Sequence, residues 1–110
     1  GVPTALDNTW GAGIALRGFE PGVDIVMQAL TKYPSGGGDV LMGSVTTRDE
    51  ALHQRIKRAH MHLGLGVGAN DAELGLRSLA SLPQPVARAS WSRPKTELQI
   101  WIGADSRSTW

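Results

Sequence analysis

The sequence predicts an α/β fold with a largely parallel sheet, and three observations lead to that prediction. Short apolar segments typical of strands occupy residues 2–6, 24–30 and 40–46. Two amphipathic segments with helical spacing follow the last of them. Connections rich in glycine and proline separate the segments. Strands with helices between and after them are typical of a mostly parallel sheet with crossover helices.

The strand predictions rest on residue type. Residues 2–6 are mostly apolar or β-branched, and a polar turn follows them at Asp7. Residues 24–30 are apolar at nearly every position, as expected for a parallel strand covered on both faces. A proline and three glycines in residues 34–38 cannot continue that strand. Residues 40–46 are therefore expected to form a third strand that returns from the turn.

Two helices are predicted after the third strand. Thr47 and Glu50 have the spacing of a capping box, with Thr47 as the N-cap of the first helix. Its buried face is expected to carry apolar residues three and four positions apart, namely Leu52, Ile56, Ala59 and Leu63. Its outer face is expected to carry three arginines, Arg48, Arg55 and Arg58. The second helix is predicted from Asn70 to a stop at Pro83.

Composition excludes several classes of function. A formal net charge of +1 gives no basic surface for nucleic acid. The absence of cysteine excludes disulfides and thiolate zinc sites, and it fits a reducing compartment. The chain has neither an apolar run of membrane-spanning length nor a charged leader followed by an apolar segment. We therefore expect a cytoplasmic protein with no membrane partner.

Lys32 is the first candidate for a catalytic residue. It follows the second strand and enters a glycine-rich turn, where a lysine amine is well placed to form a Schiff base. Asp7 stands at the end of the first strand. A lysine of this kind, paired with an acid for a pyridinium nitrogen, is typical of pyridoxal 5'-phosphate (PLP) chemistry. The alternatives are that Lys32 is an ordinary solvated lysine and that Asp7 caps a turn through Asn8 and Thr9.

Two motifs resemble those of a known family. The first is Asp7-Asn8-Thr9-Trp10, and the second spans residues 24–36 and contains Thr31-Lys32-Tyr33. In this order and at this separation they resemble the Cys/Met metabolism PLP-dependent enzymes, over residues 1–83. Within the family the resemblance is strongest to the cystathionine β-lyase branch, because the γ-lyases and γ-synthases more often have phenylalanine where this chain has Trp10.

The resemblance implies a fold and a set of site residues. It implies a segment of the aminotransferase-like (fold type I) large domain and PLP as the cofactor. Lys32 would be the catalytic Schiff-base lysine, Asp7 the partner of the ring nitrogen, and Thr31 a ligand of the cofactor phosphate. Ala29 stands where relatives often carry a phosphate-binding serine.

The resemblance also implies an activity. This is β-elimination from a cystathionine-like sulfur amino acid, giving homocysteine, pyruvate and ammonia, in the transsulfuration route to methionine. The alternatives are a γ-lyase or γ-synthase of the same family, or a non-catalytic truncated product. The parent enzyme is expected to be a homotetramer, and the 110 residues alone are expected to be an inactive internal fragment.

The chain changes character near Pro83. Residues 1–83 carry 7 basic and 8 acidic residues, whereas residues 84–110 carry 4 and 2. Three of the four tryptophans, Trp91, Trp101 and Trp110, lie after this point. We therefore expect a partial PLP-binding domain at 1–83 and an atypical tail at 84–110. A shifted reading frame, or a fused or divergent tail, would explain this change, and we expect residues 84–110 to be poorly packed, irregular or disordered.

The remaining motifs are interpreted as structural. Three histidines, His53, His60 and His62, fall on the first predicted helix, but they do not share one face and no carboxylate completes a set. No metal site is predicted. Residues 64–68 contain three glycines at alternate positions, but they follow a helix rather than a strand and are interpreted as a connection. Arg77 is expected to be a structural arginine on the second helix.

Overall fold

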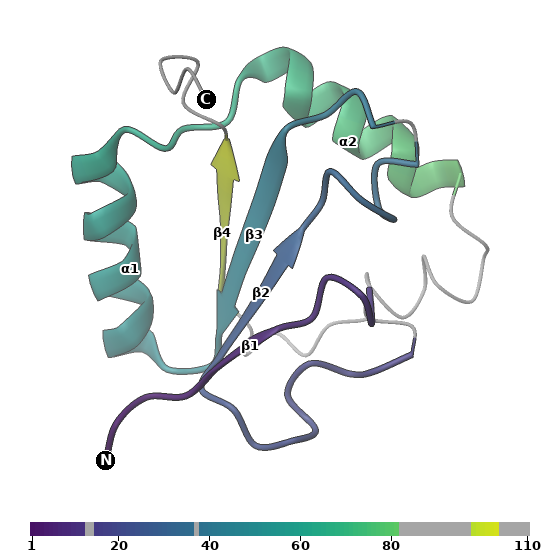
Figure 1. Cartoon of the computed structure of the whole chain (residues 1–110). Helices are drawn as coiled ribbons and strands as arrows, with labels where there is room; N and C mark the ends of the chain where they lie inside the picture. The colour runs from purple at the N-terminus through teal and green to yellow at the C-terminus, as the bar shows by residue number, and fades with distance from the viewer. Residues whose placement is uncertain (13–14, 37, 82–97, 104–110) are drawn as a thin grey trace, which may run out of the picture.

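The computed structural model describes residues 1–12, 15–36, 38–81 and 98–103. Within these residues, four strands and two helices follow one another in the order β1, β2, β3, α1, α2, β4 (Figure 1). The strands are β1 (Ala5–Asp7), β2 (Ile25–Ala29), β3 (Met42–Thr47) and β4 (Leu98–Gly103), and the helices are α1 (Glu50–Leu63) and α2 (Ala69–Ser81). The predicted α/β class is confirmed.

The strands form one mixed sheet in the order β1-β2-β3-β4. β1 and β2 are parallel, with Asp7 opposite Met27. The pairs β2–β3 and β3–β4 are antiparallel. The prediction of a largely parallel sheet with crossover helices is therefore wrong. The described part of the connection from β2 to β3 consists of turns, and an antiparallel neighbour needs no helix to cross the sheet.

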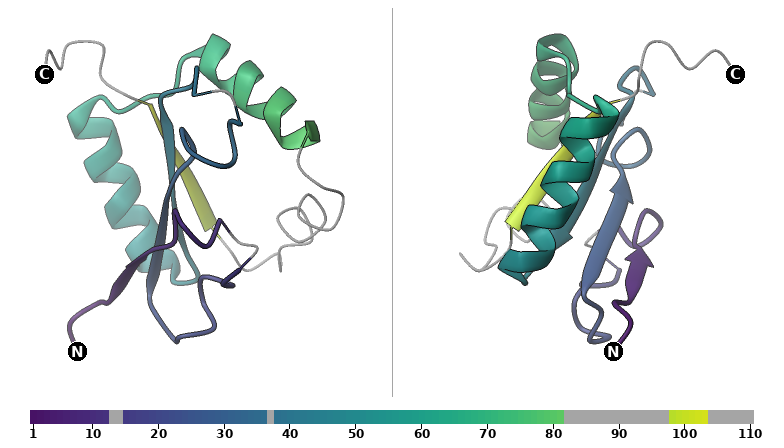
Figure 2. Two further views of the ribbon diagram at one scale, coloured as in Figure 1. Left: turned by 45° about the vertical axis from the view of Figure 1, so that its right-hand side comes forward. Right: turned by 90° about the vertical axis from the view of Figure 1, so that its left-hand side faces the viewer.

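The two helices lie in different places around the sheet, α1 over one face and α2 beyond one end. In the right-hand view of Figure 2, α1 lies over β3 and β4, and β1 is at the opposite edge. α2 lies beyond the end of the sheet at which β2 finishes (Figure 1). Gly75 brings α2 close to the first residue of β3, since a Cβ atom at Gly75 would lie 2.6 Å from Met42 Cε. Within the described part of the chain, neither helix is long and apolar enough to cross a membrane.

The core under β2 is small. Among the described residues, the buried apolar side chains are Val26, Leu30 and Val40. The connection from β1 to β2 crosses the face that carries Val26, because a Cβ atom at Gly18 would lie 2.6 Å from Val26 Cγ1. Met27, which points to the other face, is 39% exposed. β2 is therefore not covered on both faces, contrary to the prediction.

α1 begins at a different cap from the one predicted. Asp49 is its N-cap, and Asp49 Oδ1 accepts a hydrogen bond from the Leu52 amide at 2.6 Å. Thr47 is instead the last residue of β3 and is 1% exposed. Its hydroxyl donates to the Asp24 carbonyl at 2.9 Å and accepts from the Asp49 amide at 3.2 Å. Thr47 therefore cannot cap the helix, because its hydroxyl already joins two other segments.

The sheet-facing side of α1 differs in part from the predicted one. Leu52 and Ile56 are half-buried as expected, but Ala59 and Leu63 are exposed. His53 and His60 are half-buried in their place. A histidine has an apolar ring edge, so it can lie against a sheet although apolar spacing alone does not select it. The three arginines are exposed as predicted: Arg48, Arg55 and Arg58.

Part of the predicted tail belongs to the sheet. Leu98–Gly103 forms β4 and pairs with the whole of β3, so the expectation of irregular structure is wrong for these residues. Residues 82–97 and 104–110, with Trp91 and Trp110, lie outside the described residues. The division of the chain at Pro83 stays a prediction.

Candidate active site at the carboxyl ends of β1 and β2

Asp7 and Lys32 belong to two segments that lie side by side at one end of the sheet. Asp7 is the last residue of β1, and Lys32 follows the end of β2 by three positions (Figure 1). Because β1 and β2 are parallel, their carboxyl ends point the same way. Both side chains are exposed. The fold therefore places a carboxylate and an amine at the end of the sheet where ligands of α/β proteins bind.

The Asp7 carboxylate is held by Thr9. Asp7 Oδ1 accepts one hydrogen bond from the Thr9 hydroxyl at 2.6 Å and one from the Thr9 amide at 2.9 Å. These bonds, the hydroxyl bond above all, lower the pKa of Asp7, because they stabilise the charged carboxylate. Among the described residues, none donates a hydrogen bond to Oδ2. Asp7 thus offers one charged oxygen to a donor from outside.

Thr9 also connects this loop to β2. Its hydroxyl oxygen accepts a hydrogen bond from the Ala29 amide at 2.9 Å. One residue earlier, the Asn8 amide donates to the Met27 carbonyl at 2.8 Å and extends the ladder past the end of β1. The Lys32 amide in turn donates to the Ala29 carbonyl at 3.3 Å. A hydrogen-bonded path therefore runs from Asp7 through Thr9 and Ala29 to Lys32.

The turn that carries Lys32 is closed by Ser35. The Ser35 hydroxyl lies 2.8 Å from the Thr31 carbonyl oxygen and 3.2 Å from the Lys32 carbonyl oxygen, and it donates to both. The Gly36 amide also donates to the Lys32 carbonyl, at 3.3 Å. Ser35 itself is buried, whereas the Lys32 side chain is exposed. The main chain of the lysine is therefore fixed while its amine stays accessible.

Thr31 is connected to the start of β3. Its hydroxyl donates to the Met42 carbonyl at 3.4 Å and accepts from the Met42 amide at 3.3 Å. Both hydrogen bonds are long, and such bonds are weak. A phosphate oxygen can therefore replace the Met42 carbonyl as the acceptor of the Thr31 hydroxyl proton at small cost. The role of Thr31 as a phosphate ligand stays a prediction.

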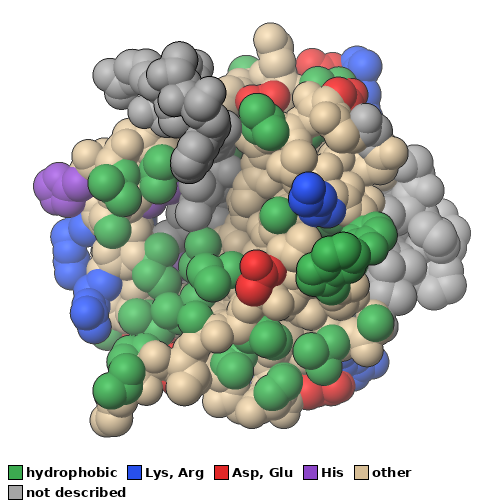
Figure 3. Space-filling view, in the orientation of Figure 1, with side chains coloured by type: hydrophobic (Ala, Val, Ile, Leu, Met, Phe, Trp, Pro, Cys, Tyr) green, Lys and Arg blue, Asp and Glu red, His purple; other side chains and the backbone are tan. Residues whose placement is uncertain are grey.

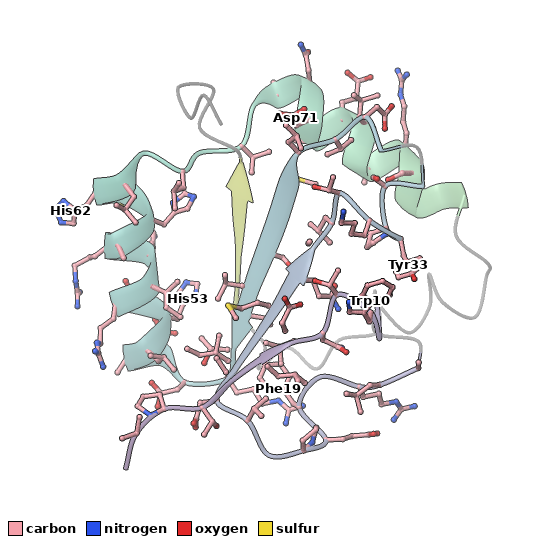
Figure 4. All side chains as sticks on the ribbon, viewed as in Figure 1. Trp10, Phe19, Tyr33, His53, His62 and Asp71 are labelled. Carbon is pink, nitrogen blue, oxygen red and sulfur yellow. The ribbon has the colours of Figure 1, made fainter. Side chains whose placement is uncertain are left out.

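An aromatic pair joins the two site loops on the outside. Trp10 is 84% exposed and Tyr33 is 51% exposed, and their ring centroids lie 6.1 Å apart in an edge-to-face arrangement. Figure 4 shows the two rings side by side at the carboxyl ends of β1 and β2. In Figure 3 an acidic and a basic side chain lie beside a large apolar cluster on the same face. Sequence reasoning missed the contact, although one aromatic residue adjoins each loop.

Asn8 and Ser35 are the buried polar residues that shape these loops, and sequence reasoning did not select either. Asn8 is 3% exposed, and its amide group donates to the Leu16 carbonyl at 2.9 Å. The interpretation of Asp7 as a turn cap is correct, since the Asp7 carboxylate accepts a hydrogen bond from the Thr9 amide two positions later. Because the cap uses one oxygen only, it does not exclude a second role for the carboxylate.

The other residues considered in the sequence, Arg77 and the glycine-rich segment 64–68, have structural roles. Arg77 donates to Glu73 at 2.6 Å on the exposed side of α2, as expected for a structural arginine. Gly64 ends α1 with a φ of 66°, and residues 65–68 lead to α2, so the glycine-rich segment is a connection. In the described part of the chain, no three His, Asp or Glu residues gather as metal ligands would.

Comparison with known proteins gives three informative relatives. A cystathionine beta-lyase from Bordetella avium is 40% identical over 84 residues, which are 76% of this chain and 21% of the relative. The cystathionine beta-lyase MetC of Bacillus subtilis (strain 168) is 37% identical over 90 residues, 82% of this chain and 23% of the relative. A cystathionine gamma-lyase from Bos taurus is 32% identical over 111 residues, 92% of this chain and 27% of the relative.

These relatives are several times longer than the aligned segment, and the chain spans 21% of the length of the first of them. No solved structure matches the chain significantly. The family model described as Cys/Met metabolism PLP-dependent enzyme matches residues 1–94, which include β1, β2, β3 and both helices. The match also extends past Pro83. The chain therefore belongs to the Cys/Met metabolism PLP-dependent enzyme family.

Proposed function

We propose that this chain carries the lysine and the acidic residue of a PLP-dependent carbon–sulfur lyase of the cystathionine β-lyase kind. The observation that supports this best is the hydrogen-bonded path that joins Asp7 to Lys32 at the carboxyl ends of β1 and β2. The family membership and the two β-lyase relatives support it independently. We infer the fold type I architecture of the parent, and its assembly as a homotetramer, from the family alone.

The residues present fit PLP at two of its groups. The free oxygen of an ionised Asp7 suits a protonated pyridine nitrogen, because a carboxylate stabilises the charged ring. The accessible amine of Lys32, on a fixed main chain, suits the aldehyde. For the phosphate, the site offers the hydroxyl of Thr31, whose present hydrogen bonds are long.

Asp7 and Lys32 would have different roles in β-elimination. When bound, PLP supplies a sink for the electron pair left as the substrate loses the proton on its α-carbon. Asp7 would keep the ring nitrogen protonated. Lys32 would hold the cofactor through its aldehyde, and its amine, when free, would be the base that accepts the proton of the substrate α-carbon. The thiolate expelled from the β-carbon of cystathionine would take up a proton to give homocysteine, and one water molecule would hydrolyse the remaining three-carbon fragment to pyruvate and ammonia.

The second candidate is γ-elimination or γ-replacement on the same substrate class. The similarity to the cystathionine gamma-lyase of Bos taurus supports it. Trp10 supports the β-lyase, and its exposed ring beside Tyr33 lies at the edge where the substrate would enter.

We further propose that the 110 residues alone do not turn over substrate. Asp7 and Lys32 are both exposed to solvent. Solvent weakens electrostatic interactions at such a site, and two contacts do not orient a cofactor and a substrate together. A non-catalytic truncated product fits these surroundings.

Chemical trapping tests the assignment of Lys32. The chain is incubated with PLP, reduced with borohydride and digested, and the labelled peptides are quantified. Lys32 is expected to carry most of the label, and Lys57, which is exposed on α1, serves as the internal reference. Lys32→Arg should abolish the selective label, and Lys57→Arg should leave it unchanged. Equal labelling of Lys32 and Lys57 in the wild-type chain would overturn the proposal.

Product analysis tests the reaction type. The chain is mixed with PLP and L-cystathionine, and the keto acids are measured against free PLP as the background. No product above background is expected from the chain alone. Pyruvate above background would identify β-elimination and show that the segment is active by itself. A four-carbon keto acid would identify γ-elimination instead and would replace the β-lyase assignment.

A further inference from the structure

We propose that Thr9 is a positioning residue of this site: its hydroxyl orients the Asp7 carboxylate and ties it to the strand that leads to Lys32. This inference rests on the proposed function, in which Asp7 holds a proton on the cofactor ring. Thr9 itself is assigned no contact with the cofactor or the substrate.

The direction of the hydroxyl proton follows from its two partners. The main-chain amide of Ala29 can only donate, so the Thr9 oxygen accepts in that hydrogen bond. The single hydroxyl proton is then left for Asp7 Oδ1, at 2.6 Å. That distance is typical of a hydroxyl that donates to a charged carboxylate. The two hydrogen bonds thus support each other.

The same arrangement fixes the free oxygen of the carboxylate. The hydroxyl and the amide of Thr9 both donate to Oδ1. A rotation of the carboxylate would break both hydrogen bonds at once. Oδ2, to which no described residue donates, therefore keeps one direction. A ring nitrogen that must meet a lone pair at a fixed angle benefits from such preorganisation.

The bond to Ala29 also sets the separation of the two site segments. The Lys32 amide donates to the Ala29 carbonyl, so the turn of the lysine begins at the residue that Thr9 binds. A rigid planar cofactor has a constant distance between its ring nitrogen and its aldehyde carbon. A direct link between the segments that contact these two atoms keeps the protein at the matching spacing, and small errors in spacing are costly.

The opposite end of the same strand pair provides a matched control. There Asp24 Oδ2 accepts from the Thr4 amide at 2.7 Å and from the Thr4 hydroxyl at 3.0 Å. The arrangement is similar, an aspartate that accepts twice from one threonine, and the hydrogen bonds from the Thr4 amide and, second, the Thr4 hydroxyl lower the pKa of Asp24. Asp24 lies away from the lysine turn. Thr4→Val therefore removes an equivalent hydroxyl without touching the site.

The experiment combines two measurements on the full chain and its variants. Carboxyl carbon NMR gives the pKa of Asp7 without cofactor, and PLP trapping gives the concentration of PLP that half-saturates Lys32. Thr9→Val should raise the pKa of Asp7 and raise that concentration about tenfold, as expected when an orienting charge-assisted hydrogen bond is lost. Thr9→Ser keeps the hydroxyl and should behave like the wild-type chain. Thr4→Val should raise the pKa of Asp24 and leave both Asp7 and the trapping unchanged.

The possible failures can be told apart. If the wild-type chain is not selectively trapped at Lys32, the proposed function fails and this inference falls with it. If the wild-type chain is trapped, but Thr9→Val changes neither Asp7 nor the trapping, this inference alone is overturned. If circular dichroism shows that Thr9→Val does not fold, the pKa of Asp7 in the wild-type chain tests the inference instead. An Asp7 that titrates like an aspartate in an unfolded peptide overturns the inference, and a lower pKa supports it.

Discussion

Threonine hydroxyls hold the strand ends of this molecule together. The Thr4 hydroxyl connects the start of β1 to Asp24, just before β2, and the Thr9 hydroxyl connects the end of β1 to the end of β2. Thr31 and Thr47 connect β2 and its flanks to β3. A hydroxyl can donate and accept at once, and a β-branched side chain has few rotamers. Threonine therefore suits a position that must join two strand ends in a set direction.

The buried Ser35 hydroxyl is expected to stabilise the turn that carries Lys32. Ser35→Ala removes the buried hydroxyl that donates to the carbonyls of Thr31 and Lys32. We expect the free energy of unfolding to fall by about 1 kcal/mol, the usual net value of such a hydrogen bond. Amide exchange at Lys32 and Gly36 should accelerate more than exchange within α1. Urea unfolding and hydrogen exchange measure the two effects, and uniform acceleration in both regions would contradict the local role.

The sequence predicts the reactive groups of the site but not the hydrogen bonds that hold them. Asp7 and Lys32 are candidates because their two motifs resemble those of the Cys/Met metabolism PLP-dependent enzymes, whereas each residue alone also fits an ordinary role. Their linkage through Thr9 and Ala29 depends on which strands pair and in which register. Residue type and spacing do not give that register when a connection as long as residues 8–24 separates the strands.

The start of α1 gives a prediction for a single element. Asp49→Ala removes the side chain that caps the helix at the Leu52 amide. We expect the free energy of unfolding to fall by about 1 kcal/mol, within the usual range for a lost N-cap. Asp49→Ser keeps a capping group and should restore most of the loss. Denaturant unfolding measures both variants.

Thr47 should behave differently, because it serves the sheet. Thr47→Val removes the buried hydroxyl that donates to the Asp24 carbonyl and accepts from the Asp49 amide. We expect the free energy of unfolding to fall by about 1–2 kcal/mol, since two hydrogen bonds of about 1 kcal/mol each are lost. Helix content by circular dichroism should change little below the unfolding midpoint. A selective loss of helix would instead identify Thr47 as the cap.

The helices and the first three strands were predicted within a few residues, whereas the antiparallel direction of β3 and the presence of β4 were not. The capping-box spacing from Thr47 and the Asp49 cap lie two positions apart, so either gives nearly the same helix. Strand direction has no comparable local signal. Apolar residues throughout 24–30 fit a parallel strand and an antiparallel one equally well, and the difference lies in the connection that follows. Pro34 and the glycines after it were the informative residues there.

For the whole molecule, the sheet should be sensitive to acid. Asp7 and Asp24 sit at opposite ends of the β1–β2 pair, and hydrogen bonds from threonine lower the pKa of both. A carboxyl whose pKa is lower in the folded state contributes stability at pH values above its unfolded pKa of about 4. That contribution is lost as the pH falls through the folded pKa.

We therefore expect the melting temperature to be level near neutral pH and to fall below about pH 4. The fall should be modest, because both carboxylates are exposed and solvent screens them. Asp24→Asn should make the dependence shallower by removing one of the two contributions. Calorimetry between pH 2 and pH 7 measures it, and a melting temperature that rises on acidification would contradict the assignment.

The hydrogen bond between Thr9 and residue 29 has a consequence for sequence variation. Thr9 contributes a side chain to it, but residue 29 contributes only its main-chain amide. Mutational drift can therefore replace Ala29 by any residue except proline without loss of this bond, whereas position 9 must keep a hydroxyl. The two partners of one bond evolve under unequal constraint. A serine at position 29 would add a hydroxyl next to this hydrogen bond while the link between the Thr9 hydroxyl and the amide of residue 29 stays intact.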